Sequence, residues 1–178
     1  MRTKRVVRIA ALVVGAVALA LPFLMRAAAP PVLLNLTDSL PGRVFVRMDR
    51  EPRVGDVVAV CLPEELARFA VDRGYIARGR RCPGGASPLL KRVAALAGRE
   101  VSYDLERVEV DGVALEASAI RQHDSQGRAM PVSRAPGYVV SGGEVLLMNA
   151  HPLSFDSRYF GPVPIEAVLG VYRTWRKE

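Results

Sequence analysis

The interior of the sequence centres on Leu89-Leu90-Lys91-Arg92-Val93-Ala94-Ala95-Leu96, whose apolar side chains predict a buried β-strand. Only three of the 25 basic residues are lysines, and Lys91 alone lies away from the chain ends, because the others are Lys4 and Lys177. Burial among apolar side chains can lower the pKa of a lysine by several units, whereas an arginine keeps its proton. Lys91 is therefore a candidate general base. The alternative is a lysine at a strand edge, with its stem packed and its ammonium in water.

Shorter apolar runs on both sides of this stretch predict further β-strands, which turn residues separate. We expect these strands at residues 32–36, 43–48, 57–61, 100–103, 107–110, 113–115 and 168–174. Residues 138–140 and 144–148 are separated by Ser141-Gly142-Gly143 and predict one more hairpin.

A single helix is expected in the soluble part, at residues 63–73, because proline suits the first position of a helix and Gly74 suits its end. Residues 76–87 and 118–137 are expected to be loops. The predicted fold class is therefore mostly β, with folded antiparallel sheets and one short helix, preceded by one N-terminal transmembrane helix.

The N-terminal part of the sequence is typical of a membrane anchor. Four basic residues lie in segment 1–8, and residues 9–25 are free of charge before Arg26. This pattern predicts a cytoplasmic basic segment at 1–8, a transmembrane anchor at 9–26 and an extracytoplasmic domain at 32–178. A secretory signal peptide cleaved near Ala27-Ala28-Ala29 is the alternative, and it also sends the folded domain across the membrane.

The net charge of +7 and the pI near 10 are compatible with binding either to nucleic acid or to an anionic membrane. The arginines are scattered and do not alternate with aromatic residues, so we expect the membrane and no nucleic acid. The two histidines, His123 and His151, stand apart, and the sequence has neither a Walker loop nor a GxGxxG motif. No metal and no cofactor are therefore expected.

The two cysteines, Cys61 and Cys82, are candidates for a disulfide, because disulfides persist on the outer side of the cytoplasmic membrane. A bridge would join the end of a predicted strand to the loop at 76–87. The alternative is a pair of free thiols.

Four short segments follow one another along the chain in an informative order. They are Ser39-Leu40-Pro41, Gly55-Asp56-Val57-Val58, Lys91-Arg92-Val93 and Ser154-Phe155-Asp156-Ser157-Arg158-Tyr159-Phe160-Gly161. This series resembles the type I signal peptidases, which are membrane-anchored Ser-Lys proteases, and the resemblance covers essentially the whole chain.

Two departures from that family's pattern are informative. The serine segment is one residue shorter than Ser-Met-x-Pro, and Met148-Asn149-Ala150-His151 replaces Gly-Asp-Asn-Arg. With the small size and the single predicted span, these departures resemble the conjugative-transfer branch of the family, the TraF peptidases.

The resemblance implies a role for each matching residue. Ser39 would be the nucleophile and Lys91 the general base of a serine endopeptidase that works through an acyl-enzyme. The hydroxyl of Thr37 would help the Ser39 amide to form the oxyanion hole, and Ser154 would hold the lysine ammonium. The remaining pair, Asp156 and Arg158, would support the site as a structural ion pair.

For substrate and place, the resemblance implies a conjugative pilin precursor, trimmed at its C-terminus and joined head to tail during plasmid transfer. The enzyme would cross the bacterial inner membrane once, with its catalytic domain in the periplasm, and other mating-pore components would be further partners. Two alternatives stay open: a leader peptidase that hydrolyses signal peptides, and a non-catalytic scaffold of the mating pore. Trp175 is compatible both with a place at the bilayer surface and with the core.

Overall fold

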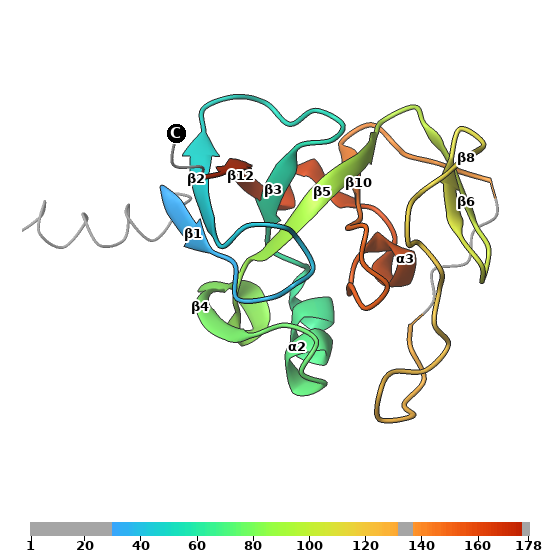
Figure 1. The fold of residues 1–178 in the computed structure, drawn as a ribbon, viewed down its shortest axis with the longest axis horizontal. Coiled ribbons are helices and arrows are strands. Elements are labelled where there is room, and N and C mark those ends of the chain that lie inside the picture. Colours follow the sequence, from blue (N-terminus) through green and yellow to red (C-terminus); the bar gives the residue numbers. More distant parts are fainter. Residues whose placement is uncertain (1–29, 132–136, 176–178) are drawn as a thin grey trace, which may run out of the picture. The chain divides into compact units, whose positions relative to one another are not determined.

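The stretch around Lys91 forms an interior strand of an antiparallel sheet in the computed structural model, which describes residues 30–131 and 137–175. Strand β5 (Leu89–Leu96) pairs with β3 (Val57–Val60) on one side and with β10 (Glu144–Leu147) on the other. The sheet has seven strands in the order β1-β2-β12-β3-β5-β10-β11 (Figure 1). The other four strands are β1 (Val32–Leu34), β2 (Val44–Met48), β11 (Val163–Pro164) and β12 (Val168–Thr174).

A second antiparallel sheet contains four strands in the order β8-β7-β6-β9. They are β6 (Glu100–Tyr103), β7 (Val108–Val110), β8 (Val113–Ala114) and β9 (Tyr138–Val139). The turn between β7 and β8 is Asp111-Gly112, whose φ angles of 50° and 76° are both positive, as a two-residue type I′ turn requires. The predicted mostly-β architecture of antiparallel sheets is confirmed.

The hairpin predicted between residues 138–140 and 144–148 is wrong, because β9 pairs with β6 and β10 pairs with β5. The two runs instead follow one another along one side of a long, bent pair of antiparallel strands, whose other side is β5 followed by β6. Gly98 N donates to Val140 O at 2.8 Å and Val140 N donates to Arg99 O at 2.9 Å, so the pairing continues from one sheet to the other. Ser141-Gly142-Gly143 is a bend between the two runs, and it allows the apolar residues on both sides of it to be buried.

Helix α2 (Glu64–Asp72) confirms the predicted helix, with Pro63 at its N-cap and Gly74 after its end. The loop predicted at 76–87 is wrong in part, since it contains strand β4 (Arg78–Cys82) and the 3₁₀ turn η1 (Pro83–Gly85). Gly79 permits this compact arrangement, because a Cβ at that position would lie 2.4 Å from Ser87 Oγ.

Residues 149–167 contain two further short elements. They are a second helix, α3 (Ser157–Phe160), and the 3₁₀ turn η2 (Ile165–Ala167). The sequence predicted only one helix in this domain. A four-residue helix is too short to show a helical period, which explains the miss. Its start is fixed by Asp156, whose side chain accepts a hydrogen bond from Arg158 N.

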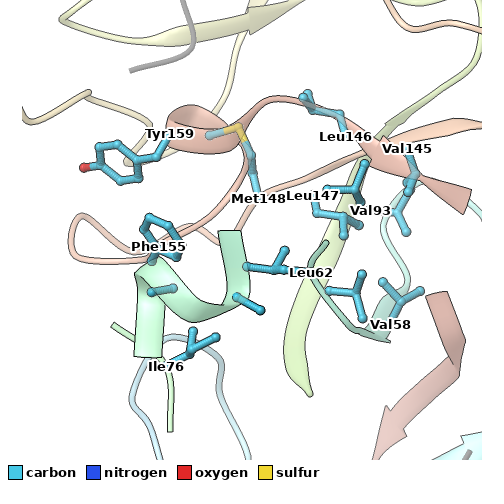
Figure 2. Packing of buried hydrophobic residues seen from close by; sticks show 14 of the residues in the cluster. Val58, Leu62, Ile76, Val93, Val145, Leu146, Leu147, Met148, Phe155 and Tyr159 are labelled. Carbon is cyan, nitrogen blue, oxygen red and sulfur yellow. The ribbon is translucent and has the colours of Figure 1, made fainter. Parts of the chain in front are cut away.

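Both faces of the larger sheet are covered, which explains the unbroken apolar run of β3. Val58 and Val60 belong to the main core, whereas Val57 and Ala59 belong to a smaller cluster with Leu40, Phe45 and Tyr172. Figure 2 shows Val58, Val93 and Leu147 of the sheet gathered in the main core together with Leu62 and Ile76. The strand that carries Lys91 is therefore anchored on a rigid layer.

The predicted segments 1–8 and 9–26 lie outside the described residues, so the structure does not test them. Within the described ranges, none of the helices combines the length and the apolarity that crossing a bilayer requires. Trp175, directly after β12, is 58% exposed, which excludes a core position for it.

A disulfide joins Cys61, after β3, to Cys82, at the end of β4, and it closes the segment 61–82, which contains α2. Closing a chain segment of this length is worth about 3 kcal/mol in the chain-entropy description of disulfides.

We expect Cys61→Ser/Cys82→Ser to lose about that much free energy of unfolding, measured by urea titration. Thiol labelling of the denatured, unreduced wild type should modify neither cysteine; two labels per chain would contradict the bridge.

Candidate active site

The Gly-Asp motif sets the register of the lysine strand. Gly55 N donates to Val93 O and Val93 N donates to Asp56 O, both at 2.8 Å, which extends the pairing of β3 with β5. Gly55 has a φ of +91°, where a side chain is disfavoured. The Asp56 carboxylate accepts two hydrogen bonds from Arg50, at 2.5 and 2.6 Å, and these lower its pKa. The motif thus fixes Lys91 opposite Val58.

Lys91 is 3% exposed, and its Nζ donates a hydrogen bond to Ser154 Oγ at 2.7 Å. Burial lowers the pKa of Lys91 from 10.5 to about 8. Asp156 acts in the opposite direction and raises this pKa, whereas Arg158 lowers it further. A pKa near 8 leaves about a tenth of the amines neutral at pH 7. Lys91 can therefore accept a proton under physiological conditions.

The Asp156–Arg158 ion pair is fully buried, and both of its charges act on Lys91. Arg158 Nε donates to Asp156 Oδ1 at 2.8 Å, and a second guanidinium nitrogen donates to Asp156 Oδ2 at 3.1 Å. The guanidinium also donates to backbone carbonyls, those of Asn149 at 2.9 Å, Ala117 at 2.7 Å and Ala119 at 3.3 Å. The charges are thus balanced, and the donors tie the loop before residue 120 to the loop that bears Ser154.

Asn149, from the stretch that departs from the family pattern, holds the backbone on either side of Lys91. Its Oδ1 accepts from Arg92 N at 2.9 Å, and its Nδ2 donates to Leu90 O at 3.2 Å. The carboxamide thereby replaces a backbone peptide group at the point where β10 leaves β5. This role could not be predicted from the sequence, because an asparagine in an irregular segment gives no local signal of it.

The loop between β1 and β2 carries Ser39 and Thr37, whose hydroxyl oxygens lie 2.9 Å apart within hydrogen-bonding distance. Leu40, the next residue, is buried in the smaller apolar cluster. Ser39 itself is half-buried. Among the described residues, no hydrogen bond joins Ser39 Oγ directly to Lys91 Nζ.

A cavity of about 480 Å³ brings these groups together. Its lining includes four of the predicted site residues: Thr37, Ser39, Lys91 and Ser154. Apolar side chains from β1, from the start of β5 and from the segment after α2 complete the wall, among them Leu33, Ile76, Leu89 and Leu90. Asp156 and Arg158 do not line it. The disulfide closes the segment 61–82, which carries the wall residues 75–77.

His151, which the sequence did not connect with the site, also lines the cavity. Its Nδ1 accepts a hydrogen bond from Leu153 N at 3.2 Å. Leu153, Tyr75 and Phe155 line both this cavity and a neighbouring one of about 240 Å³, whose lining also includes Tyr159 and Met130. No group of three or more potential metal ligands occurs within the described part of the chain.

Comparison with known proteins gives consistent results. The family described as signal peptidase, peptidase S26, matches residues 3–175. The probable conjugal transfer protein TraF of Sinorhizobium fredii is 42% identical over 141 residues, which are 78% of this chain and 73% of that protein. The conjugal transfer protein TraF of Agrobacterium fabrum is 40% identical over 79% of each chain. A plasmid transfer protein TraF of Escherichia coli is 36% identical over 94% of this chain and 97% of that protein.

Among solved structures, a signal peptidase I from Enterococcus faecalis aligns with 68% of this chain and 97% of its own, at a TM-score of 0.40 and 19% identity.

Proposed function

The chain belongs to the signal peptidase family, peptidase S26, and on that premise we propose that it is a membrane-anchored serine endopeptidase with a Ser39–Lys91 dyad. One observation carries this proposal: a buried lysine with a pKa near 8 shares a cavity with a serine hydroxyl. Ser154 holds the amine of that lysine at 2.7 Å, so the base is oriented before substrate arrives.

In the first half of the reaction, neutral Lys91 takes the proton of Ser39 while Ser39 Oγ attacks the carbonyl carbon of the scissile bond. The tetrahedral intermediate collapses as its C–N bond breaks, and protonated Lys91 gives that proton to the leaving amine. The products of this half are an acyl-enzyme ester on Ser39 and a peptide with a new amino terminus. Lys91 is then neutral again and ready for the second half.

In the second half, an incoming nucleophile attacks the ester carbonyl. Lys91 accepts the proton that this nucleophile loses and returns it to Ser39 as the ester bond breaks. Water yields a free carboxylate, whereas an amine yields a new amide bond. In both halves the developing oxyanion would be stabilised by the Ser39 amide and the Thr37 hydroxyl, a type of donor worth about 3 kcal/mol in acyl transfer.

The substrate that we propose is a conjugative pilin precursor, since the relatives are conjugal or plasmid transfer proteins. Its segment before the scissile bond would lie extended between β1 and the start of β5, where Leu33, Leu89 and Leu90 offer apolar contacts. We place the anchor at 9–26 in the inner membrane and the domain 32–178 in the periplasm, beside other mating-pore components. Head-to-tail joining of the trimmed pilin follows if the amine of the pilin reaches the ester before water does.

The test is the mass of the product made from purified pilin precursor in detergent. We expect the wild type to give a ring, lighter by one water than the trimmed linear pilin and without a free amino terminus, and Ser39→Ala to give no product. A linear product would indicate an ordinary hydrolytic peptidase. Plasmid transfer that survives Ser39→Ala would indicate a scaffold.

A further inference from the structure

We propose that Asn35 is the residue that positions the nucleophile, an inference that rests on the proposed role of Ser39. Asn35 follows β1 and is 5% exposed. Its backbone N donates to Arg43 O at 2.8 Å, as a further rung between β1 and β2. Its side chain therefore enters the loop of residues 36–42, which carries Ser39.

The donor side of the carboxamide fixes the second half of that loop. Asn35 Nδ2 donates to Leu40 O at 3.0 Å and to Gly42 O at 3.1 Å. Gly42 has a φ of +99°, and a Cβ there would lie 2.4 Å from Thr174 Cγ2. Strand β12 therefore packs closely against this part of the loop and leaves no room for a side chain at residue 42. The residue directly after Ser39 is thus held both by its buried side chain and by its carbonyl.

The acceptor side fixes the first half. Asn35 Oδ1 accepts from Thr37 N at 3.1 Å and from Thr37 Oγ1 at 2.9 Å. All four hydrogen-bonding positions of the carboxamide are therefore used within one loop. The orientation of the amide is determined by its partners, because the reverse one would set its NH₂ against the Thr37 N–H and its oxygen against two carbonyls. Ser39 lies between two anchor points of a single side chain.

This arrangement also determines the direction of the hydroxyl protons. Thr37 has one hydroxyl proton, and Asn35 Oδ1 takes it. In the 2.9 Å contact between the two hydroxyls, Ser39 must then be the donor and Thr37 the acceptor. The proton of Ser39 is directed at Thr37 in this structure, while the amine of Lys91 is occupied by Ser154. Attack on substrate requires two hydroxyl rotations: that of Ser39 from Thr37 toward Lys91, and that of Thr37 from Asn35 Oδ1 toward the developing oxyanion. Asn35 keeps the loop that carries both residues in place through its other three hydrogen bonds.

The test compares Asn35→Ala with Asn35→Asp, which keeps the acceptor for Thr37 but lacks the two donors. The probe is the p-nitrophenyl ester of N-acetyl-alanyl-alanine, whose burst of p-nitrophenol counts the active sites of the full-length protein in detergent. We expect Asn35→Ala to lower the acylation rate per active site about 100-fold, as a misplaced reacting group does, while its pH profile still rises to a plateau near pH 8. In Asn35→Asp a carboxylate oxygen faces the Leu40 and Gly42 carbonyls in place of the two donors, so the rate should stay low although the acceptor for Thr37 is kept.

Two further measurements separate positioning from folding. Thr37→Val should be impaired and Thr37→Ser close to wild type. The losses in Asn35→Ala/Thr37→Val should be less than additive, because the two single variants share the contact between Asn35 Oδ1 and Thr37 Oγ1. The Thr37 amide should exchange its hydrogen faster in Asn35→Ala than in the wild type and Asn35→Asp. An unchanged rate per active site in Asn35→Ala, with only fewer active sites, would overturn the positioning role, as would unchanged exchange at Thr37. A wild type without any burst would contradict the proposed function instead, and the exchange at Thr37 would still decide whether Asn35 holds the loop.

Discussion

Replacing Lys91 by methionine is expected to abolish cleavage and, at neutral pH, to make the protein more stable. Methionine has a similar length and no charge, so it fills the buried site without a base. Loss of general base catalysis alone should lower the cleavage rate about 10⁴-fold. A lysine with a pKa near 8 in the folded protein and 10.5 when unfolded weakens folding by about 3 kcal/mol wherever both states are protonated. Methionine removes that penalty.

The sign of the pH dependence follows from the same two pKa values. Between about pH 8 and 10.5 the unfolded chain binds more protons at Lys91 than the folded one, so the stability of the wild type rises with pH across this window. The advantage of Lys91→Met should therefore be largest below pH 8 and should disappear toward pH 10.5. Urea unfolding at several pH values measures it. A variant that is less stable than the wild type at pH 7 would contradict a buried, destabilising ammonium.

Lys91→Arg is the matched control for charge. It keeps a cation but cannot lose the proton, so it should be as inactive as Lys91→Met. The wild-type cleavage rate should increase about tenfold per pH unit up to about pH 8 and then level off. Cleavage by Lys91→Arg at a rate near that of the wild type would exclude Lys91 as the base.

The sequence was most informative where a pattern is local. The apolar runs at β3 and β5 and the Asp111-Gly112 turn each predicted their own structure, because burial and turn geometry depend on neighbouring residues. Lys91 stood out in the sequence because it is the only lysine that lies away from the chain ends. The bent pair of strands was missed, since Ser141-Gly142-Gly143 suits a hairpin turn and a bend equally well. Only the long-range pairing of β9 and β10 decides between them.

The residues that hold the site in place could not be found in this way. Asn35 and Asn149 act on neighbours through carboxamide hydrogen bonds whose partners are fixed by the fold. For Asn149 those partners are about 60 residues away in the chain, and no spacing rule relates such positions. His151 is a similar case, because a loop histidine before proline gives no indication that it lines a cavity.

The Asp156–Arg158 pair should give the largest losses of stability in the domain. Both side chains are fully buried, and removing one partner leaves the other as an uncompensated charge. We expect Asp156→Ala and Arg158→Met each to lose about 3–5 kcal/mol of free energy of unfolding. The double variant Asp156→Ala/Arg158→Met should lose less than the sum of the two, because it removes both charges together. Thermal and urea unfolding of the three variants would measure this coupling.

The same pair should move the pH dependence of cleavage in opposite directions. Asp156 raises the pKa of Lys91 and Arg158 lowers it, so removal of the carboxylate favours the neutral amine and removal of the guanidinium favours the ammonium. The rising limb of the pH profile should therefore shift to lower pH in Asp156→Ala and to higher pH in Arg158→Met, at temperatures where each variant is still folded. A loss of stability alone would lower the amount of active protein without shifting the limb. If the limb shifted in the same direction in both variants, the pair would act on Lys91 through the shape of the loop. Loss of its two opposite charges would instead shift the limb in opposite directions.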